Sequence, residues 1–297
     1  MIIYAGIAVF CQSCFTGVEN TAKINISKKE EAILSPKEED NILSDYKPLP
    51  LSEWQEEKEF IVADKRLQLL IESEEYTPET GDKVTYRGIK ARNGADGSEK
   101  AVLEFSHGEQ SFFYPIDRSV SESLETVVSS DIPMLIDSDM IGFVKNKLQG
   151  RNLWTKTSLW YDGEGNNLKG KKYYNVSVYD VTPGDAFFPI RVSFYSNEGS
   201  ASLLMNIGGG GNDSRSFSKL FYLKDPKLTY RNISDDNWRL IQNEQIKPGM
   251  TKEECRLSKG NPSEIESGHN YSNTVEIWMY PNGSFLRFID GILTDYK

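Results

Sequence analysis

Histidine, cysteine and clustered positive charge are scarce in this sequence. Its 297 residues include two histidines and three cysteines, and the formal net charge is −10. With so few histidines, we expect neither a histidine-based metal site nor a catalytic triad, and we predict no metal, no cofactor and no catalytic residue. Because neutralising phosphates needs clustered lysine and arginine, the acidic charge also argues against a nucleic-acid partner.

Long apolar runs are missing as well. No run reaches the length of about 20 apolar residues that a membrane-spanning helix needs. The first residues read MIIYAGIAVFCQSC, in which Cys11 and Cys14 end a short apolar run. This pattern resembles a signal peptide that ends in the lipobox of bacterial lipoproteins. The resemblance implies that residues 1–14 are a signal segment and that Cys14 carries a lipid that anchors the protein in a bacterial cell envelope. The alternative is a fortuitous apolar start without an anchor.

Periodic apolar residues are sparse between residues 15 and 50. This segment is polar and dense in charge, and it contains Pro36, Pro48 and Pro50. Such a composition is typical of a linker. We therefore expect a tether that holds the folded part of the chain away from the membrane.

Aromatic residues are plentiful, with 14 Phe and 15 Tyr in the whole sequence, and this composition favours β-structure. Short apolar runs separated by turn signals predict a first β-domain over residues 51–118 and a second over 119–231. A helix over residues 137–148 is expected to lead the second domain, with Asp137 or Ser138 as its cap. The predicted fold class is mainly β, with one or two small antiparallel barrels or sandwiches followed by an α+β module.

Residues 232–297 carry the strongest local signals. In KPGMTKEECRLSKGNP, Thr251 and Glu254 form a capping box and Gly260 precedes a proline, so both ends of a helix are specified. An apolar stripe that begins at a Ser234 cap predicts an earlier helix. Asn-Gly and Asp-Gly turns then separate three predicted strands. The expected order is ααβββ, in two layers.

The same hairpins predict which side chains share a face of the sheet. Counted from a two-residue turn at Asn282-Gly283, Met279 pairs with Leu286 and Ile277 pairs with Phe288, on the side that faces the helices. The opposite side then carries aromatic side chains and arginine, which are enriched at interfaces. The predicted interaction face consists of Trp278, Tyr280, Phe285, Arg287 and Tyr296. The alternative is that these side chains pack against the preceding β-domain.

The stretch KPGMTKEECRLSKGNP followed by VEIWMYPNGSFLRFIDGIL resembles the SmpA/OmlA family. Its members are small outer-membrane lipoproteins of the β-barrel assembly machinery with an ααβββ fold. The resemblance covers roughly the last sixty residues and implies a non-catalytic module. Cys255 stands where the family usually has an apolar residue, which implies that its thiol is a buried filler.

Two functions are compatible with these features. The first is a non-enzymatic lipoprotein that acts as a scaffold and binds a protein partner at the outer membrane. The alternative is a periplasmic or surface lipoprotein that binds a glycan or a peptide on aromatic side chains of the second β-domain, namely Trp154, Trp160 and Tyr174. A hydrolase that uses only carboxylates ranks last, because the sequence nominates no pair of them.

Overall fold

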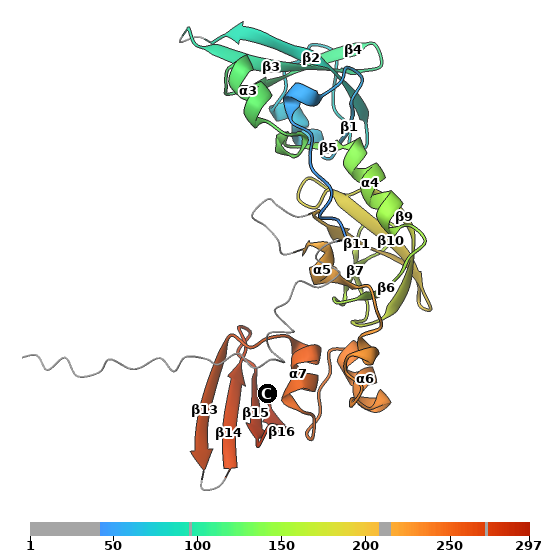
Figure 1. Cartoon of the computed structure of the whole chain (residues 1–297), viewed down its shortest axis with the longest axis vertical. Helices are drawn as coiled ribbons and strands as arrows, with labels where there is room; N and C mark the ends of the chain where they lie inside the picture. Colours follow the sequence, from blue (N-terminus) through green and yellow to red (C-terminus); the bar gives the residue numbers. More distant parts are fainter. Residues whose placement is uncertain (1–41, 95–96, 208–214, 271–272) are drawn as a thin grey trace, which may run out of the picture. The chain divides into compact units, whose positions relative to one another are not determined.

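The computed structural model describes residues 42–94, 97–207, 215–270 and 273–297, all within one compact unit of the chain. Three antiparallel sheets follow one another along the sequence, with short helices between them (Figure 1). The predicted fold class, mainly β with an α+β module at the end, is confirmed. The predicted signal segment, Cys14 and the first part of the predicted tether lie outside the described residues.

The first sheet has five strands in the order β4-β3-β2-β1-β5. The strands are β1 (Glu59–Val62), β2 (Lys83–Asn93), β3 (Glu99–His107), β4 (Gln110–Ile116) and β5 (Leu135–Asp137). The short helices of this region are η1 (Leu51–Glu53), η2 (Lys65–Leu69), α3 (Val120–Thr126) and η3 (Ser129–Asp131). Alternate side chains of the strands enter one core, in which Phe60, Phe105 and Phe112 are fully buried.

This sheet extends past residue 118, where the sequence predicted the end of the first β-domain. β5 pairs with β1, and Val127, Ile132 and Leu135 are buried in the core of the first sheet. The first region therefore reaches Asp137. The stretch between β4 and β5 is mostly polar, so its sequence resembles a linker. Its few apolar side chains are buried by tertiary contacts, which the local sequence does not reveal.

The predicted tether is also shorter than expected at its C-terminal end. Leu43 is buried in the core of the second sheet, and the ring of Tyr46 lies 5.3 Å from that of Phe143. Pro50 forms an isolated β-bridge with Val128. Residues 42–50 thus belong to the folded part of the chain.

Helix α4 (Ser138–Leu148) confirms the helix predicted between the two β-regions. Asp137 is its N-cap, and the side chain of Asp137 accepts a hydrogen bond from the backbone N–H of Asp139. Three apolar residues at helical spacing are buried in the core of the second sheet, namely Met140, Val144 and Leu148. The helix therefore covers the inner face of that sheet.

The second region is a single sheet of seven strands in the order β12-β6-β9-β10-β11-β7-β8. The strands are β6 (Asn152–Thr155), β7 (Leu159–Tyr161), β8 (Asn167–Lys169), β9 (Asn175–Pro183), β10 (Ile190–Ser196), β11 (Gly199–Met205) and β12 (Phe221–Tyr222). Two short helices accompany them, α5 (Phe217–Leu220) and η5 (Pro226–Leu228). A sandwich of two sheets was one of the expected alternatives, but the described residues of this region form one sheet. Trp160 and Phe194 are buried in the core on its inner face.

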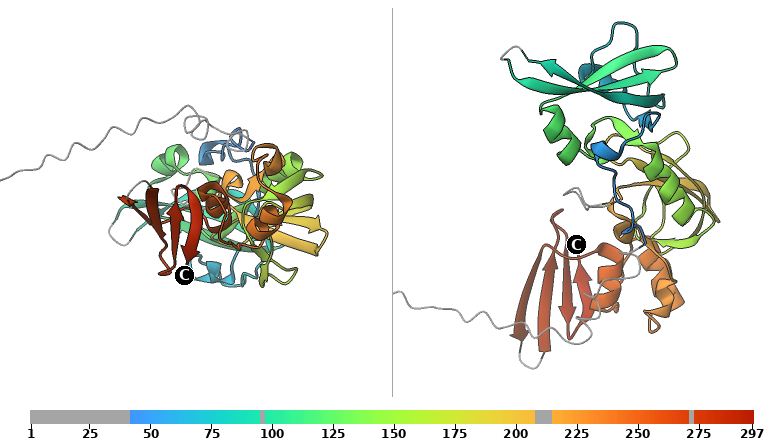
Figure 2. Two further views of the ribbon diagram at one scale, coloured as in Figure 1. Left: turned by 90° about the horizontal axis from the view of Figure 1, so that it is seen from below. Right: turned by 45° about the horizontal axis from the view of Figure 1, so that its top comes forward.

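The C-terminal module has two helices and a four-stranded sheet in the order β13-β14-β15-β16. Its elements are α6 (Asp235–Gln242), α7 (Lys252–Lys259), β13 (Glu264–Asn270), β14 (Asn273–Met279), β15 (Phe285–Ile289) and β16 (Ile292–Tyr296). Figure 2 shows the two helices on the same side of the sheet. Both predicted helix caps are present, since Ser234 accepts from the N–H of Asn237 and the Thr251 capping box is complete. Strand β13 was not predicted, because the sequence EIESGHN is polar and contains glycine.

The predicted register of the β14–β15 hairpin is wrong by one residue. The N–H of Tyr280 donates to Ser284 O at 3.0 Å and the N–H of Gly283 donates to Tyr280 O at 2.9 Å, so the loop has three residues instead of two. Trp278 therefore pairs with Leu286 and Met279 pairs with Phe285. Since side chains alternate along a strand, this slip moves every β14 side chain to the opposite face.

The second hairpin has the predicted two-residue turn. Asp290 and Gly291 have φ values of 50° and 82°, as a turn with two left-handed residues requires, and Ile289 pairs with Ile292. Phe288 then pairs with Leu293, as expected. A bulge after Arg287 shifts the rest of β16.

Candidate functional site

On the side of the C-terminal sheet that faces away from the helices, the two central strands are apolar, and the flanking strands place Glu264, Glu266 and Asp295 beside them. Trp278, Leu286, Phe288 and Leu293 enter the core with the helices, so the alternate residues of β14 and β15 point to the other side. We call these residues the outer face: Val275, Ile277, Met279, Phe285, Arg287 and Ile289. The apolar members are half-buried and Arg287 is exposed. An antiparallel sheet with one free side usually presents polar residues there, so the two central strands depart from the common pattern.

Two of the five predicted interaction residues, Phe285 and Arg287, lie on the outer face. Trp278 does not, because it is 1% exposed and its ring lies 4.7 Å from that of Phe288 in the core. Its indole N–H donates to Glu276 Oε2 at 3.2 Å, which satisfies the polar atom inside the module. The one-residue slip of the hairpin explains this correction.

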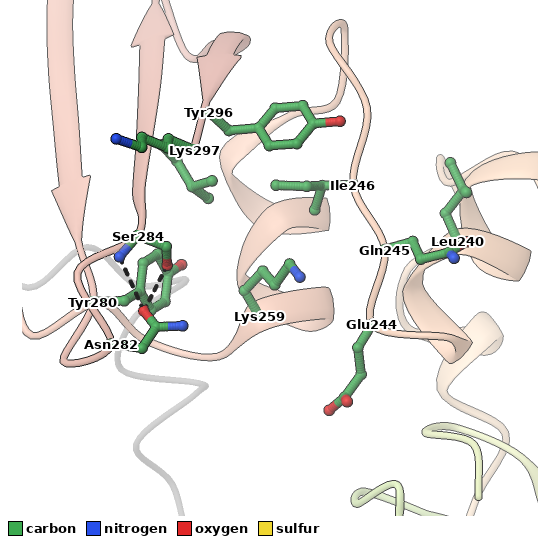
Figure 3. Close-up of a pocket in the computed structure, with 11 residues that line it drawn as sticks. Leu240, Glu244, Gln245, Ile246, Lys259, Tyr280, Asn282, Ser284, Tyr296 and Lys297 are labelled. Atoms are coloured by element: carbon green, nitrogen blue, oxygen red, sulfur yellow. Dashed lines mark hydrogen bonds between the residues drawn. The ribbon is translucent and has the colours of Figure 1, made fainter. Parts of the chain in front are cut away.

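Tyr280 and Tyr296 lie on the helix side of the sheet. Both line a cavity of about 550 Å³, the C-terminal cavity, together with Leu286 and Ile246 (Figure 3). The hydroxyl of Tyr280 donates to Gly260 O at 3.2 Å, and burial raises the pKa of this phenol to about 12. Tyr296 reaches the cavity because the β16 bulge places it opposite Leu286. The predicted face therefore divides between two opposite sides of the sheet.

Three charged side chains line the C-terminal cavity, namely Glu244, Lys259 and Lys297. Figure 3 shows the carboxylate of Glu244 directed away from Tyr296 and Ile246. Glu244 forms an ion pair with Lys172 at 2.9 Å. Burial acts to raise the pKa of Glu244, but the hydrogen bond and charge of Lys172 outweigh it and lower that pKa.

The second region has a smaller cavity, which we call the polar cavity. Its volume is about 390 Å³, and its lining includes two of the predicted ligand aromatics, Trp154 and Tyr174. The third, Trp160, is 1% exposed and packs edge-on against Phe194 with ring centroids 5.1 Å apart. Trp160 is therefore a core residue. Ser177, Tyr195 and Asp225 were not predicted, since they come from separate segments that only folding brings together.

Contacts between the second region and the C-terminal module run through the helices. The hydroxyl of Tyr173 donates to Leu257 O at 3.1 Å, and Lys172 Nζ donates to Ser258 O at 3.0 Å. The ring of Tyr173 also lies edge-on to Trp238, at 5.8 Å. In the part of the chain that the structure describes, the hydrogen bonds and core contacts between these two regions thus leave the outer face unused.

Metal-ligating side chains are not grouped at either cavity in the described residues. Across the described ranges no group of three His, Cys, Asp or Glu side chains is placed to hold a metal ion. Cys255 is fully buried, and burial raises the pKa of its thiol to about 12, which fits the expected filler role. Among the residues described, no helix combines the length and the apolar character that spanning a bilayer requires.

No protein-family model matches this chain, and no match was found among curated proteins.

Proposed function

We propose that this chain is a non-enzymatic, lipid-anchored protein of a bacterial cell envelope that binds a protein partner through the outer face of its C-terminal module. The observation that carries the proposal is the outer face itself. Five half-buried apolar side chains lie beside the exposed Arg287 on two adjacent strands, bordered by Glu264 and Glu266 of β13 and by Asp295 of β16. Contiguous apolar surface with an arginine is typical of protein interfaces, whose cores are enriched in aromatic residues, methionine and arginine.

Two further features support this role. The outer face belongs to a module whose sequence resembles the SmpA/OmlA family, in which the fold serves assembly at the outer membrane. The proposed lipid on Cys14 would bring that module to the membrane, and the chain that follows Cys14 would span the distance. A partner that fits the face would offer an apolar patch with a carboxylate for Arg287.

The structure offers a matched pair of substitutions to test the outer face. Ile277 is on the outer face. Ile265 of β13 pairs with Trp278, so it points to the helix side, and it is 50% exposed. We would crosslink the full-length protein in membranes and compare Ile277→Glu with Ile265→Glu. We expect the captured partner to be lost with Ile277→Glu and kept with Ile265→Glu, because only the former places a charge in the apolar face.

Thermal unfolding of both variants completes the test. Equal melting temperatures would show that lost capture reflects the surface and not the fold. Capture that survives Ile277→Glu, or that is lost equally with Ile265→Glu, would argue against the outer face as the binding site. The anchor is tested separately with Cys14→Ser, which should move the protein from the membrane fraction and abolish the mass increase that acylation causes.

A further inference from the structure

The polar cavity of the second region has a lining unlike that of the outer face or the C-terminal cavity. It lies on the outer side of the second sheet, where Trp154 of β6 pairs with Asn175 of β9 and Ser177 of β9 pairs with Tyr195 of β10. At about 390 Å³ it falls within the range of roughly 300–1,000 Å³ that is usual for small-molecule sites. It is large enough for one or two rings of a small ligand.

Aromatic surface borders the cavity and is held in place. The ring of Tyr195 is 57% exposed and stacks on the ring of Tyr179, with centroids 4.3 Å apart and an interplanar angle of 27°. Trp154 is half-buried nearby in the lining. Exposed rings that are already fixed by packing lose little conformational freedom on binding, and their faces suit the apolar C–H surface of a ligand.

The polar part of the lining is rich in amides and hydroxyls and poor in free charge. These residues are Asn175, Ser177, Ser196, Asn197 and Gln242. Amide and hydroxyl groups both donate and accept hydrogen bonds, as ligand hydroxyls also do. Lys227, the one cation among the lining residues that the structure describes, forms an ion pair with Asp235 at 2.9 Å. A phosphate or carboxylate would therefore have to compete with Asp235 for its counter-charge.

Among the described residues of this lining, Asp225 supplies the only carboxylate. Its Oδ1 atom accepts a hydrogen bond from the backbone N–H of Lys227 at 2.9 Å, which fixes the orientation of the side chain. A fixed carboxylate can accept from two neighbouring hydroxyl groups of one ring. Hydrolysis of a glycosidic bond needs a second carboxylate, which the lining does not supply, so this arrangement suits binding without cleavage.

We infer that the polar cavity is a binding site for a neutral oligosaccharide, with one sugar ring stacked on Tyr195 or Trp154 and its hydroxyls bonded to Asp225 and the amides. A sugar ring combines an apolar C–H face with hydroxyls at its edge, and this pair of properties matches the aromatic and the amide-rich parts of the lining. The site is independent of the outer face and of the proposed protein partner.

The test uses the full-length protein and an array of oligosaccharides that contains cello-, malto-, chito- and mannooligosaccharides, with oligogalacturonates as acidic members. Hits are then titrated by calorimetry against the wild-type protein, Tyr195→Ala, Asp225→Asn and Tyr296→Ala. Tyr296 is a matched control, because it is a tyrosine of similar exposure, 44%, in the other cavity. Thermal melts establish that each variant is folded.

We expect at least one neutral oligosaccharide to bind, with affinity reduced about tenfold or more by Tyr195→Ala, reduced also by Asp225→Asn, and unchanged by Tyr296→Ala. Trp154→Phe, which retains a ring, should weaken binding less than Tyr195→Ala. The inference is overturned if no neutral member binds, if only acidic members bind, or if Tyr195→Ala and Tyr296→Ala have the same effect. None of these outcomes bears on partner capture by the outer face.

Discussion

The ammonium group of Lys58 lies 2.9 Å from Asp137 Oδ1, and both side chains are 4% exposed. Lys58 precedes β1, and Asp137 ends β5 and caps α4, so the ion pair ties the first sheet to the helix that leads the second region. Asp139 contacts the same ammonium group, and the hydroxyl of Tyr46 lies 3.5 Å from Asp137 Oδ2. Lys58 thus serves two carboxylates.

Removal of Lys58 leaves a buried carboxylate without its counter-charge. We expect Lys58→Ala to lower the free energy of unfolding by about 3–5 kcal/mol, as is usual when one partner of a buried pair is deleted. Lys90→Ala is the control, because Lys90 is 61% exposed in its ion pair with Glu104 and such pairs contribute about 0–1 kcal/mol. Urea unfolding compares the two, and equal effects would contradict a special role for Lys58.

Gly170 lies against the buried Trp160. A Cβ atom at Gly170 would be 2.0 Å from Trp160 Cδ2, so Gly170→Ala forces the ring to move and should destabilise the second region by about 1–3 kcal/mol. Gly163→Ala is the matched control, since no atom lies within 4 Å of its added Cβ. Chemical denaturation followed by tryptophan fluorescence measures both variants. A loss with Gly163→Ala as large as that with Gly170→Ala would refute the packing argument.

The capping box of α7 should be measurable by itself. Thr251 Oγ1 accepts from the N–H of Glu254 at 3.2 Å, and Glu254 Oε2 accepts from the N–H of Thr251 at 2.7 Å. We expect Thr251→Ala to cost about 1 kcal/mol of stability, within a usual range of about 0.5–2. Thr251→Ser keeps the hydroxyl and should restore most of the loss in thermal unfolding. If serine behaves like alanine, the hydroxyl does not stabilise the helix.

Substitutions in β14 distinguish the observed register from the one expected for a two-residue turn. Trp278→Ala removes a fully buried indole and should lower the free energy of unfolding by about 3–5 kcal/mol. Ile277→Ala removes a half-buried side chain from the outer face, and we expect less than half of that loss. Denaturant titration of both variants gives the comparison. The reverse order would mean that Ile277, and not Trp278, lies in the core.

The Cys255 thiol should be inert in the folded protein. Because burial raises its pKa to about 12, the thiol stays protonated at neutral pH and does not attack disulfide reagents. Thiols titrated with such a reagent should be equal in number for the protein and for Cys255→Ala in the native state. In guanidinium the Cys255→Ala variant should have one fewer. Equal counts in guanidinium, or a native difference, would contradict burial of this thiol.

The same group makes stability depend on pH in one direction. Its folded pKa is raised above the ordinary value of 9, so the folded state holds the proton more tightly than the unfolded state. This contribution is complete below pH 9 and is lost as the pH rises from 9 towards 12. The alkaline loss of stability should therefore be smaller in Cys255→Ala than in the parent protein, when both are followed by circular dichroism.

Helix α7 could be predicted from sequence because its signals are local. The capping box, the buried Met250 and Cys255, and the terminal Gly260 all lie within a few residues of one another. The β14–β15 hairpin shows where local reasoning fails. An Asn-Gly pair suits both two-residue and three-residue loops, and the choice decides the face of every side chain in β14.

Strands β5 and β13 and the polar cavity depend on distant parts of the chain. β5 has three residues and pairs with β1, and β13 is polar and pairs with β14, so neither has a pattern of its own. Trp154 could be nominated as a ligand aromatic from its type alone. Asp225 and Tyr195 could not, because their proximity to Trp154 arises from the order of the strands and not from spacing in the sequence.

Tyr173 belongs to the second region in sequence but packs against the C-terminal module, which bears on how the module could pass between genes. It adopts a left-handed backbone conformation, with φ of 53°, and packs against the core of the two helices, where its hydroxyl donates to a carbonyl group 84 residues further along the chain. A fragment that begins at residue 232 would lack this tyrosine and leave Trp238 without one of its ring contacts. The packing of the C-terminal module therefore includes a residue from the second region. A gene that encoded only residues 232–297 would produce helices without this contact.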